Sequence, residues 1–384
     1  MRNRKSVIYV NYSPYENSGK ILDYLLENFD YVFLFSLGFY NLKNKKRYNT
    51  LFIYKKKKLL KKHLLFQFTI SSSLMFYLLP VRSAINLMQI MWHTFRFTKR
   101  YGKADTYFSV NAYTAWIGLI MKKMGLVQKT VFWVWDYYPP IHEDKIIMLM
   151  RMIYWQFDKI SSHSDRVVFV NNRLMQLRKE IGVLPRNKSF PVVSIGTDLL
   201  FKERSDSKTL TFGFIGVIKK SQGIEMILDN AEYIKKHFPQ VKFEIIGSGP
   251  DEDHFKRMVK DFVFPVTFHG YLEGESFNDV LAKCTIGIAT YIPDKSNVSH
   301  YGDPGKIKRY LSLGLPVIAT DVFEFSDEII KSGAGIIIDY NDQKMFVSSV
   351  KKIMNNYQVY RRNAITLCRR YYYKKIYPKL FSAG

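Results

Sequence analysis

Short apolar segments alternate with amphipathic segments along the chain, and the alternation occurs in two separate series. The first series opens with a strand-like segment at 7–11 and an amphipathic segment at 21–28, and the second opens at Leu210. The polar, charged stretch 196–210 between them is typical of a linker. Because strands that alternate with helices indicate parallel βαβ units, the sequence predicts an α/β chain of two parallel-sheet domains. Ligands of such sheets bind beyond the carboxyl ends of the strands, so we expect the site in a cleft between the domains.

The predicted strands are apolar segments rich in β-branched and aromatic residues. They lie at 7–11, 31–36, 106–110, 130–135 and 166–170 in the first series, and at 211–215, 242–246, 266–268, 286–290, 317–319 and 335–338 in the second. The basic, aromatic segment 356–380 is predicted to be one helix. We therefore divide the chain into an N-terminal domain at 1–200, a C-terminal domain at 205–355 and a helical segment at 356–384.

The formal net charge of +25 implies a negatively charged partner. Nucleic acid, anionic lipid and phosphorylated small molecules all qualify. The sequence contains no helix-turn-helix, RRM, KH or zinc pattern, so we expect no nucleic-acid partner. Its two cysteines, Cys284 and Cys368, make neither a disulfide framework nor a metal site, which fits a reducing, cytosolic setting.

A lysine cluster is predicted to form a basic amphipathic helix that lies on an anionic membrane. Its lysines are Lys55, Lys56, Lys57, Lys58, Lys61 and Lys62, and Leu59, Leu60 and Leu64 fall at helical spacing on the other side. The uncharged segment 64–81 follows, but its polar residues and Pro80 argue against a spanning helix. We expect this segment to insert from one side or to form apolar surface beside the membrane. The alternative is a core element of the first domain that follows a solvated lysine loop.

The segment 303–321 predicts a complete helix followed by a buried strand. Asp303 is a natural N-cap, Pro304 suits the first helical position, and Gly314 suits the left-handed residue past the helix end. Lys306 adds a cation to the free N–H groups and the positive dipole end of the first turn, and together these predict a phosphate site. The alternative is ordinary packing between a helix and a strand.

Three loops after strands of the second series are further candidates. In the first, Gly216 permits close approach of a ligand to the backbone, and Lys219 and Lys220 are candidate phosphate contacts, unless they are simply an exposed lysine loop. The second contains Gly249 in a tight turn, without the spacing of a dinucleotide fingerprint. The third carries His269, for which a packing role is the alternative.

The first series offers two candidates. Gly19, in the first loop between a strand and a helix, permits close approach of a donor phosphate to the backbone. Asp136 follows the predicted strand 130–135 and is a candidate base or sugar contact, or equally a cap of the next turn. The neighbouring aromatic residues suggest either a sugar-stacking wall or, for Trp133 above all, a buried strand.

As a set, these loops resemble the C-terminal domain of GT-B glycosyltransferases, and the resemblance is greatest to the retaining, nucleotide-sugar-dependent family 4. It covers residues 205–355, and ends in the pattern K-x-x-x-Y-L-x-x-G-x-P-V-I-A-T-D that starts at Lys306. The resemblance implies two Rossmann-like domains, a nucleoside-diphosphate-sugar donor in the second domain and an acceptor in the first. It also implies a last helix that crosses back to the first domain, and a retaining outcome.

The chain departs from the family pattern at the residues that hold the donor. Val217 stands where the family usually has Arg, and Gln222 where it usually has Lys. Arg309 replaces a Glu that often binds the ribose, and Tyr301 stands where an acidic residue would fall. We expect Lys306 and Arg309, with the two lysines of the first loop, to supply the positive charge instead. Asp303 is a candidate carboxylate near the sugar or ribose.

The sequence therefore predicts a glycosyltransferase that is peripheral at the inner, cytoplasmic face of the cell membrane and that acts on a lipid-linked or polysaccharide acceptor. We expect it to need no cofactor besides the donor, and no metal, because cations and helix dipoles stabilise the leaving diphosphate. Asp136 and Asp303 are the catalytic candidates. A nucleotide-sugar epimerase of the same fold is one alternative, and a catalytically silent partner subunit is another.

Overall fold

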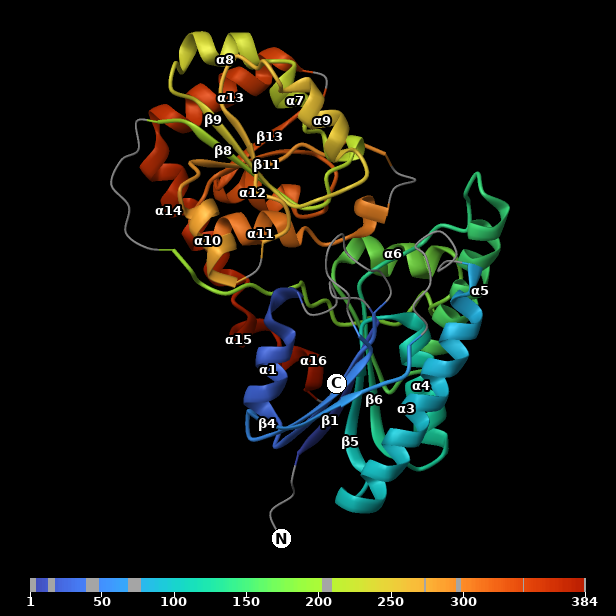
Figure 1. Ribbon diagram of the computed structural model, residues 1–384. Coiled ribbons are helices and arrows are strands. Elements are labelled where there is room, and N and C mark those ends of the chain that lie inside the picture. The colour runs from blue at the N-terminus through green and yellow to red at the C-terminus, as the bar shows by residue number, and fades with distance from the viewer. Residues whose placement is uncertain are drawn as a thin grey trace. The chain divides into compact units, whose positions relative to one another are not determined.

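The computed structural model divides into two compact units, residues 1–195 with 376–384, and residues 196–375 (Figure 1). The structure describes residues 5–12, 18–38, 48–67, 77–201, 209–272, 274–294, 298–340 and 342–382. Each unit is an α/β fold built on its own sheet. No helix among these residues is both long and apolar enough to cross a bilayer. The predicted apolar segment 64–81 lies partly outside the described residues.

The first unit is built on a seven-stranded sheet of order β4-β3-β2-β1-β5-β6-β7. Its strands are β1 (Ser6–Asn11), β2 (Tyr31–Ser36), β3 (Thr50–Lys55), β4 (Lys58–Leu64), β5 (Ala104–Ser109), β6 (Val127–Val134) and β7 (Arg166–Phe169). Every side chain of the central strand β1 is buried, as expected of a parallel strand covered on both faces. All neighbours pair in parallel except β2 with β3 and β3 with β4.

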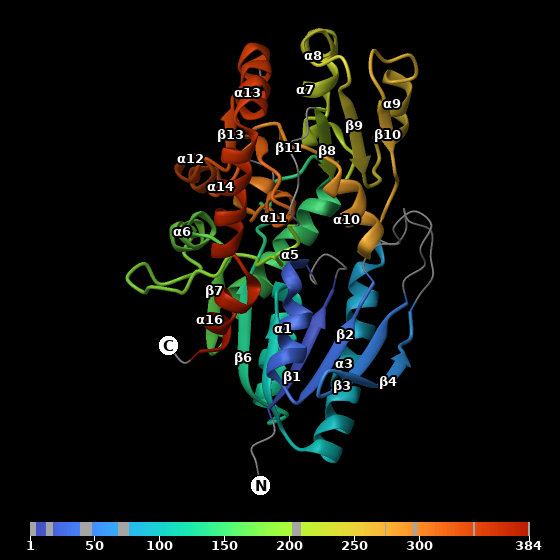
Figure 2. The same cartoon turned by 90° about the vertical axis from the view of Figure 1, so that its left-hand side faces the viewer.

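Helices cover both faces of this sheet. They are α1 (Ile21–Asn28), α3 (Leu79–Tyr101), α4 (Ala112–Lys123), α5 (Lys145–Ser161), α6 (Asn172–Glu180) and α16 (Pro378–Phe381). Figure 1 shows α3, α4 and α5 on one face and α1 on the other, and Figure 2 shows α1 and α3 again on opposite faces. The helix α16 packs on the face of α1, where the ring of Phe381 stacks on that of Tyr24.

The structure corrects the predicted basic helix at Lys55–Lys62. These residues form an antiparallel hairpin in which Lys55 of β3 pairs with Lys58 of β4. Lys56 and Lys57 form the turn with φ of 46° and 68°, the left-handed conformation of a two-residue hairpin loop. The strand β4 is the edge of the sheet and most of its side chains are exposed, so the lysines are solvated without a helix.

The second unit is built on a six-stranded parallel sheet of order β10-β9-β8-β11-β12-β13. Its strands are β8 (Thr211–Ile215), β9 (Lys242–Ile246), β10 (Val266–Phe268), β11 (Ile286–Ala289), β12 (Val317–Thr320) and β13 (Gly335–Ile338). Its helices include α7 (Glu225–Leu228), α8 (Ala231–His237), α9 (Glu252–Met258), α10 (Gly274–Ala282), α11 (Gly305–Ser312), α12 (Ser326–Ser332) and α13 (Gln343–Asn355). Successive strand residues alternate between two hydrophobic clusters, one on each face.

The predicted single helix at 356–380 is also corrected. It is three helices, α14 (Tyr357–Arg370), α15 (Tyr373–Ile376) and α16. The break after α14 arises because Tyr372 forms a β-bridge with Thr197, and Pro378 then begins α16. The helix α14 packs on α11 and α12 in the second unit, whereas α16 packs on β6 in the first.

Candidate functional site

The loops after β8 and β9 are locked together through their backbones. The Gly216 amide donates to the carbonyl oxygen of Ile246 at 3.0 Å, and the Ile218 amide donates to that of Ser248 at 3.1 Å. A Cβ on Gly247 would lie 1.9 Å from the Gly216 oxygen, and one on Gly249 would lie 2.1 Å from the Ile218 oxygen. Glycine is therefore required at both positions by the packing of the two loops, whether or not a ligand approaches Gly249.

Lys306, in the first turn of α11, reaches the loop after β8. Its Nζ donates to Oε1 of the buried Gln222 at 2.8 Å, and its Cε would lie 3.2 Å from a Cβ on Gly216. The ammonium lies 4.0 Å from the ring centroid of Phe214 and 4.5 Å from that of Tyr291. Gly216 and Gln222 of the first predicted loop therefore meet Lys306 of the segment 303–321 at the carboxyl ends of the strands.

The charge on Lys306 is not compensated by a carboxylate. Within the described part of the chain, this lysine forms no ion pair with Asp or Glu. Burial, and then the nearby positive charge of Lys219, hold the pKa of Lys306 well below its usual value. Two cations at the positive end of α11 form a place where an anion is strongly favoured. Lys220 is exposed, and its backbone amide donates to Oδ2 of Asp251 at 2.8 Å.

Asp303 does not cap α11. The helix has Pro304 at its N-cap position, without a side-chain hydrogen bond. The carboxylate of Asp303 instead forms an ion pair with the ammonium of Lys308, and the two side chains are 3% and 2% exposed. Lys308 also lies 5.0 Å from the ring centroid of Tyr371. Asp303 thus neutralises a buried lysine of the helix that follows it, and its catalytic role stays a prediction.

Two further donor candidates are paired with acidic side chains that the sequence reasoning did not connect to them. Arg309 donates to Oδ1 of Asp198 at 2.8 Å, and His269 Nε2 lies 2.6 Å from Oε2 of Glu244. Asp198 falls in the segment predicted to be a linker, and Glu244 is inside a strand, so neither position carried a motif. Tyr291 was also missed, and only its place just after β11 could have indicated it.

In the first unit, Asp136 lies two residues beyond the end of β6 and is partly buried. Burial raises the pKa of its carboxyl to about 6, although a hydrogen bond from Tyr138 and the charge of Arg178 act in the opposite direction. Arg178 also donates to the Asp136 carbonyl oxygen at 3.0 Å, while its guanidinium pairs with the buried Asp158. A carboxyl with such a pKa is suited to proton transfer near neutral pH.

The remaining candidates of the first unit are Trp133 and Gly19. Trp133 is fully buried, and its indole N–H donates to the carbonyl oxygen of Val193 at 2.8 Å. It is therefore a core residue and is not available to stack on a sugar. The carbonyl oxygen of Gly19 accepts a hydrogen bond from the hydroxyl of Tyr377. Donor contact by Gly19 stays a prediction.

Comparisons with known proteins agree with this architecture. Residues 209–356 match the model of the family described as "Glycosyl transferases group 1". A comparison with curated protein sequences returns no match. Among solved structures, sucrose-phosphate synthase from Thermosynechococcus elongatus is similar over 99% of this chain and 100% of its own, with a TM-score of 0.67 and 14% identity.

The HepE protein of Anabaena, solved with UDP and glucose, is similar over 99% of this chain and 100% of its own, with a TM-score of 0.65 and 14% identity. The structure called OtsA has a TM-score of 0.64 at 9% identity over 99% of this chain and 100% of its own. At these identities the similarity concerns the fold. The chain has the GT-B fold, with two parallel-sheet α/β domains, as the sequence predicted.

Proposed function

We propose that this protein is a glycosyltransferase that moves a sugar from a nucleoside-diphosphate sugar to a lipid-linked or polysaccharide acceptor. The family match over the second unit and the GT-B fold support the reaction class. The HepE structures contain UDP, glucose or UDP-glucose. The pneumococcal O-GlcNAc transferase GtfA, similar over 86% of this chain and 63% of its own with a TM-score of 0.54 and 12% identity, contains UDP and GlcNAc. A uridine diphosphate sugar is therefore the first donor to test.

The observation that carries the proposal is the uncompensated ammonium of Lys306. It lies between Gln222 and the loop at Gly216, with Lys219 close enough to lower its pKa. Transfer from a nucleotide sugar leaves a diphosphate with developing negative charge, and fixed cations at the right place stabilise that charge most. We therefore assign the diphosphate to Lys306 and Lys219, with the N-terminus of α11 as the third contribution. No metal is required in this scheme.

The type of acceptor and the location of the enzyme in the cell are inferred from the exposed lysine hairpin of the first unit. The hairpin of β3 and β4 presents its lysines together with Leu59, Leu60 and Leu64, which are 51%, 52% and 69% exposed. A surface that is both basic and apolar favours an anionic membrane. We propose that the enzyme works at the inner face of the membrane, and that transfer retains the anomeric configuration.

Purified protein should be tested for binding and for release of nucleoside diphosphate with a panel of nucleotide sugars. We expect one donor to bind, to release its diphosphate slowly to water, and to do so faster with acceptor. The variant Lys306→Gln should lose both signals, while Lys331→Gln, which removes one exposed lysine of α12, should keep them. Binding without release would favour the catalytically silent subunit, and absence of binding to every nucleotide sugar would overturn the proposal.

A further inference from the structure

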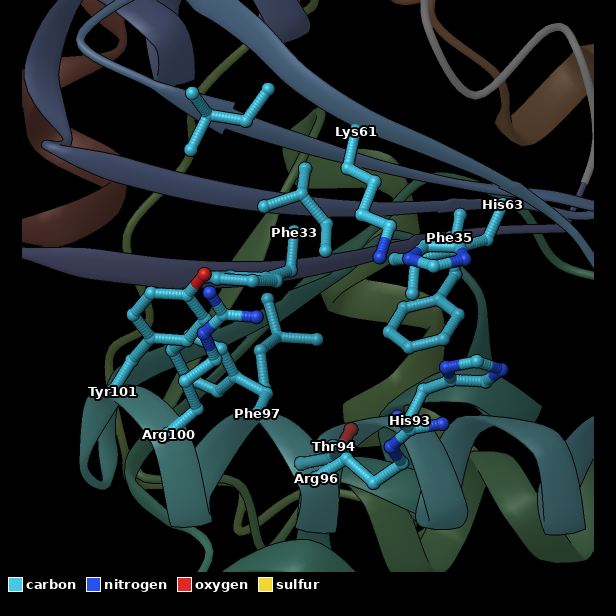
Figure 3. Close-up of a pocket in the computed structure, with 14 residues that line it drawn as sticks. Phe33, Phe35, Lys61, His63, His93, Thr94, Arg96, Phe97, Arg100 and Tyr101 are labelled. Carbon is cyan, nitrogen blue, oxygen red and sulfur yellow. The ribbon is translucent and has the colours of Figure 1, made fainter.

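A cavity of about 380 Å³ lies in the first unit between the face of the sheet and helix α3. Figure 3 shows Lys61 and His63 on the strand side, and His93, Arg96 and Arg100 on the helix side, all directed toward the space between the two. The cavity is lined by the middle of the sheet rather than by the loops at the carboxyl ends of its strands. The proposed donor site and Asp136 do not contribute to it.

One end of the cavity is a cluster of four basic side chains, Lys61, His63, His93 and Arg96. The two imidazole ring centroids are 6.0 Å apart. Burial and then nearby positive charge lower the pKa of both rings, with Lys61 and Arg96 acting on His63, and His63 and Arg96 acting on His93. Like charges held this close repel one another, and a bound anion would remove the repulsion.

Within the part of the chain that the structure describes, the wall of the cavity holds no acidic side chain to compensate this cluster. None of the residues that line the cavity is Asp or Glu. The sequence has neither residue anywhere between Tyr31 and Ala104, the segment that includes β2, β3, β4 and α3. The basic cluster therefore differs from Arg178, a buried cation of the same unit that pairs with Asp158.

Apart from the basic cluster, Arg100, Thr94 and Tyr101, the described residues of the lining are apolar. Its buried wall consists of Ile8, Phe33, Phe35, Leu51 and Phe97, whereas Leu60, Lys61 and Arg96 are exposed. Among the described residues of the lining, Thr94 and Tyr101 alone carry a hydroxyl and none carries an amide with which to bind the hydroxyl groups of a sugar or nucleoside. The cavity thus combines a cationic mouth with a hydrocarbon-like interior.

Thr94 gives an independent indication of an occupant. It is 1% exposed and lines the cavity. Its hydroxyl has no hydrogen-bond partner among the described residues. A buried hydroxyl without a partner is costly, so its presence is explained if a ligand oxygen accepts its proton.

We propose that this cavity binds a phosphorylated lipid, with the phosphate between Lys61 and Arg96 and the hydrocarbon chain against Phe33 and Phe97. A phosphate accepts charge-assisted hydrogen bonds from lysine and arginine, and a hydrocarbon chain is the occupant that the aromatic wall favours. The binding is independent of the donor site and of sugar transfer. A bilayer phospholipid and a phosphorylated carrier lipid share this chemistry.

The first experiment uses monomeric dodecyl phosphate, below its micelle concentration, and follows the ring signals of His63 and His93 by NMR. A bound anion favours the protonated ring, so the pKa of both histidines should rise toward or above the usual value. Inorganic phosphate should bind much more weakly, because it lacks the chain, and dodecyl maltoside should leave both pKa values unchanged, because it lacks the charge. Equal effects of inorganic phosphate and dodecyl phosphate would overturn the lipid assignment.

Matched variants distinguish binding in the cavity from nonspecific electrostatic binding to the basic surface. Arg96→Gln and Lys99→Gln each remove one positive charge from α3, but Arg96 lines the cavity and Lys99 lies over the ring of Phe95, outside it. We expect Arg96→Gln to weaken dodecyl phosphate binding about tenfold, the effect of one charge-assisted hydrogen bond. Lys99→Gln should bind as the unmodified protein does. Thr94→Val, nearly the same shape, should also weaken binding, and equal behaviour of all three variants would contradict the proposal.

The source of the lipid is then distinguished with phosphatidylcholine vesicles that carry equal charge as either phosphatidylglycerol or a polyprenyl phosphate. Preference for the second identifies a phosphorylated carrier lipid, and equal binding identifies a bilayer phospholipid. Either result supports lipid binding in the cavity only if the Arg96→Gln variant binds the vesicles more weakly than the Lys99→Gln variant does. These lipid-binding experiments contain no nucleotide sugar. A negative result therefore does not contradict the proposed transferase reaction, and a negative transferase assay does not contradict lipid binding in the cavity.

Discussion

At the scale of single residues, the two lysines of α11 show how differently the fold treats neighbouring cations. Lys308 is buried but paired with Asp303, whereas Lys306 is partly buried beside Lys219 and lacks a carboxylate. The counter-ion of a buried pair offsets part of the cost of burial, and an unpaired cation retains that cost until an anion binds. The contrast indicates a structural role for Lys308 and supports the proposed ligand role of Lys306, a distinction that the sequence alone did not contain.

The pH dependence of donor binding should report on Lys306. Its ammonium binds the diphosphate only while protonated, and its pKa in the free protein is well below the usual value. Donor affinity should therefore be highest at low pH and fall as pH rises through this lowered pKa, at a pH where an ordinary lysine is still charged. Lys306→Arg keeps its charge at higher pH and should shift or abolish this fall. Calorimetric titration of the nucleoside diphosphate between pH 6 and 10 measures the effect, and identical profiles for the two proteins would exclude Lys306 as its origin.

The pairing of Asp303 with Lys308 predicts a strong effect on stability. Asp303→Asn leaves a buried ammonium without its counter-ion, and we expect it to lower the free energy of unfolding by about 3–5 kcal/mol. Lys308→Met removes the charge as well, so the double variant should regain most of the stability. Urea unfolding of the single and double variants measures both changes. If the stable double variant also lost transfer activity while it still bound the donor, Asp303 would have a catalytic role besides the structural one.

At the scale of elements, the sequence predicted strands well where both faces are buried and poorly where they are not. The segments at β1, β2 and β8 were located to within one residue because their apolar runs have no helical alternative. The prediction of a helix at the lysine hairpin was wrong. An exposed edge strand has no buried face, so the spacing of its leucines does not distinguish a strand from a helix. The helix α3 was missed for a related reason, since its exposed face includes Met88, Trp92 and Phe95.

The turn of the lysine hairpin provides a prediction at this scale. Lys56 and Lys57 both have positive φ, which is unfavourable for lysine and favourable for asparagine and glycine. The double variant Lys56→Asn, Lys57→Gly should therefore raise the free energy of unfolding of the first unit, by about 1 kcal/mol. The control, Lys55→Gln with Lys58→Gln, removes the same charge from the flanking strand positions, where φ is not positive. Thermal unfolding of the two variants distinguishes the effect of the turn conformation from the effect of the lost charge. Equal stabilisation by both variants would assign the gain to reduced charge repulsion.

At the scale of the whole molecule, the first unit contains residues from both ends of the chain, and the second unit lies between them in the sequence. Residues 376–384 belong to the first unit although they follow the last helices of the other one. The hydroxyl of Tyr377 donates to the Gly19 carbonyl oxygen, and Arg166 donates to the carbonyl oxygen of Lys379 at 2.7 Å. The order of loops in the second unit predicted the two-domain fold through its family resemblance, but the contacts of the final segment depend on residues far apart in the sequence and carry no local signal.

This return of the chain makes the stability of the first unit depend on its last residues. Leu380 is fully buried in the first unit, so Leu380→Ala should destabilise that unit by about 2–5 kcal/mol. The matched control is Val359→Ala on α14, since Val359 is 54% exposed and belongs to the second unit. Hydrogen exchange followed by mass spectrometry reports the two units separately. Faster exchange in β1 and β6 of the Leu380 variant, with β8 and β12 unchanged, is the expected result, whereas equal acceleration in both units would mean that they unfold as one cooperative body.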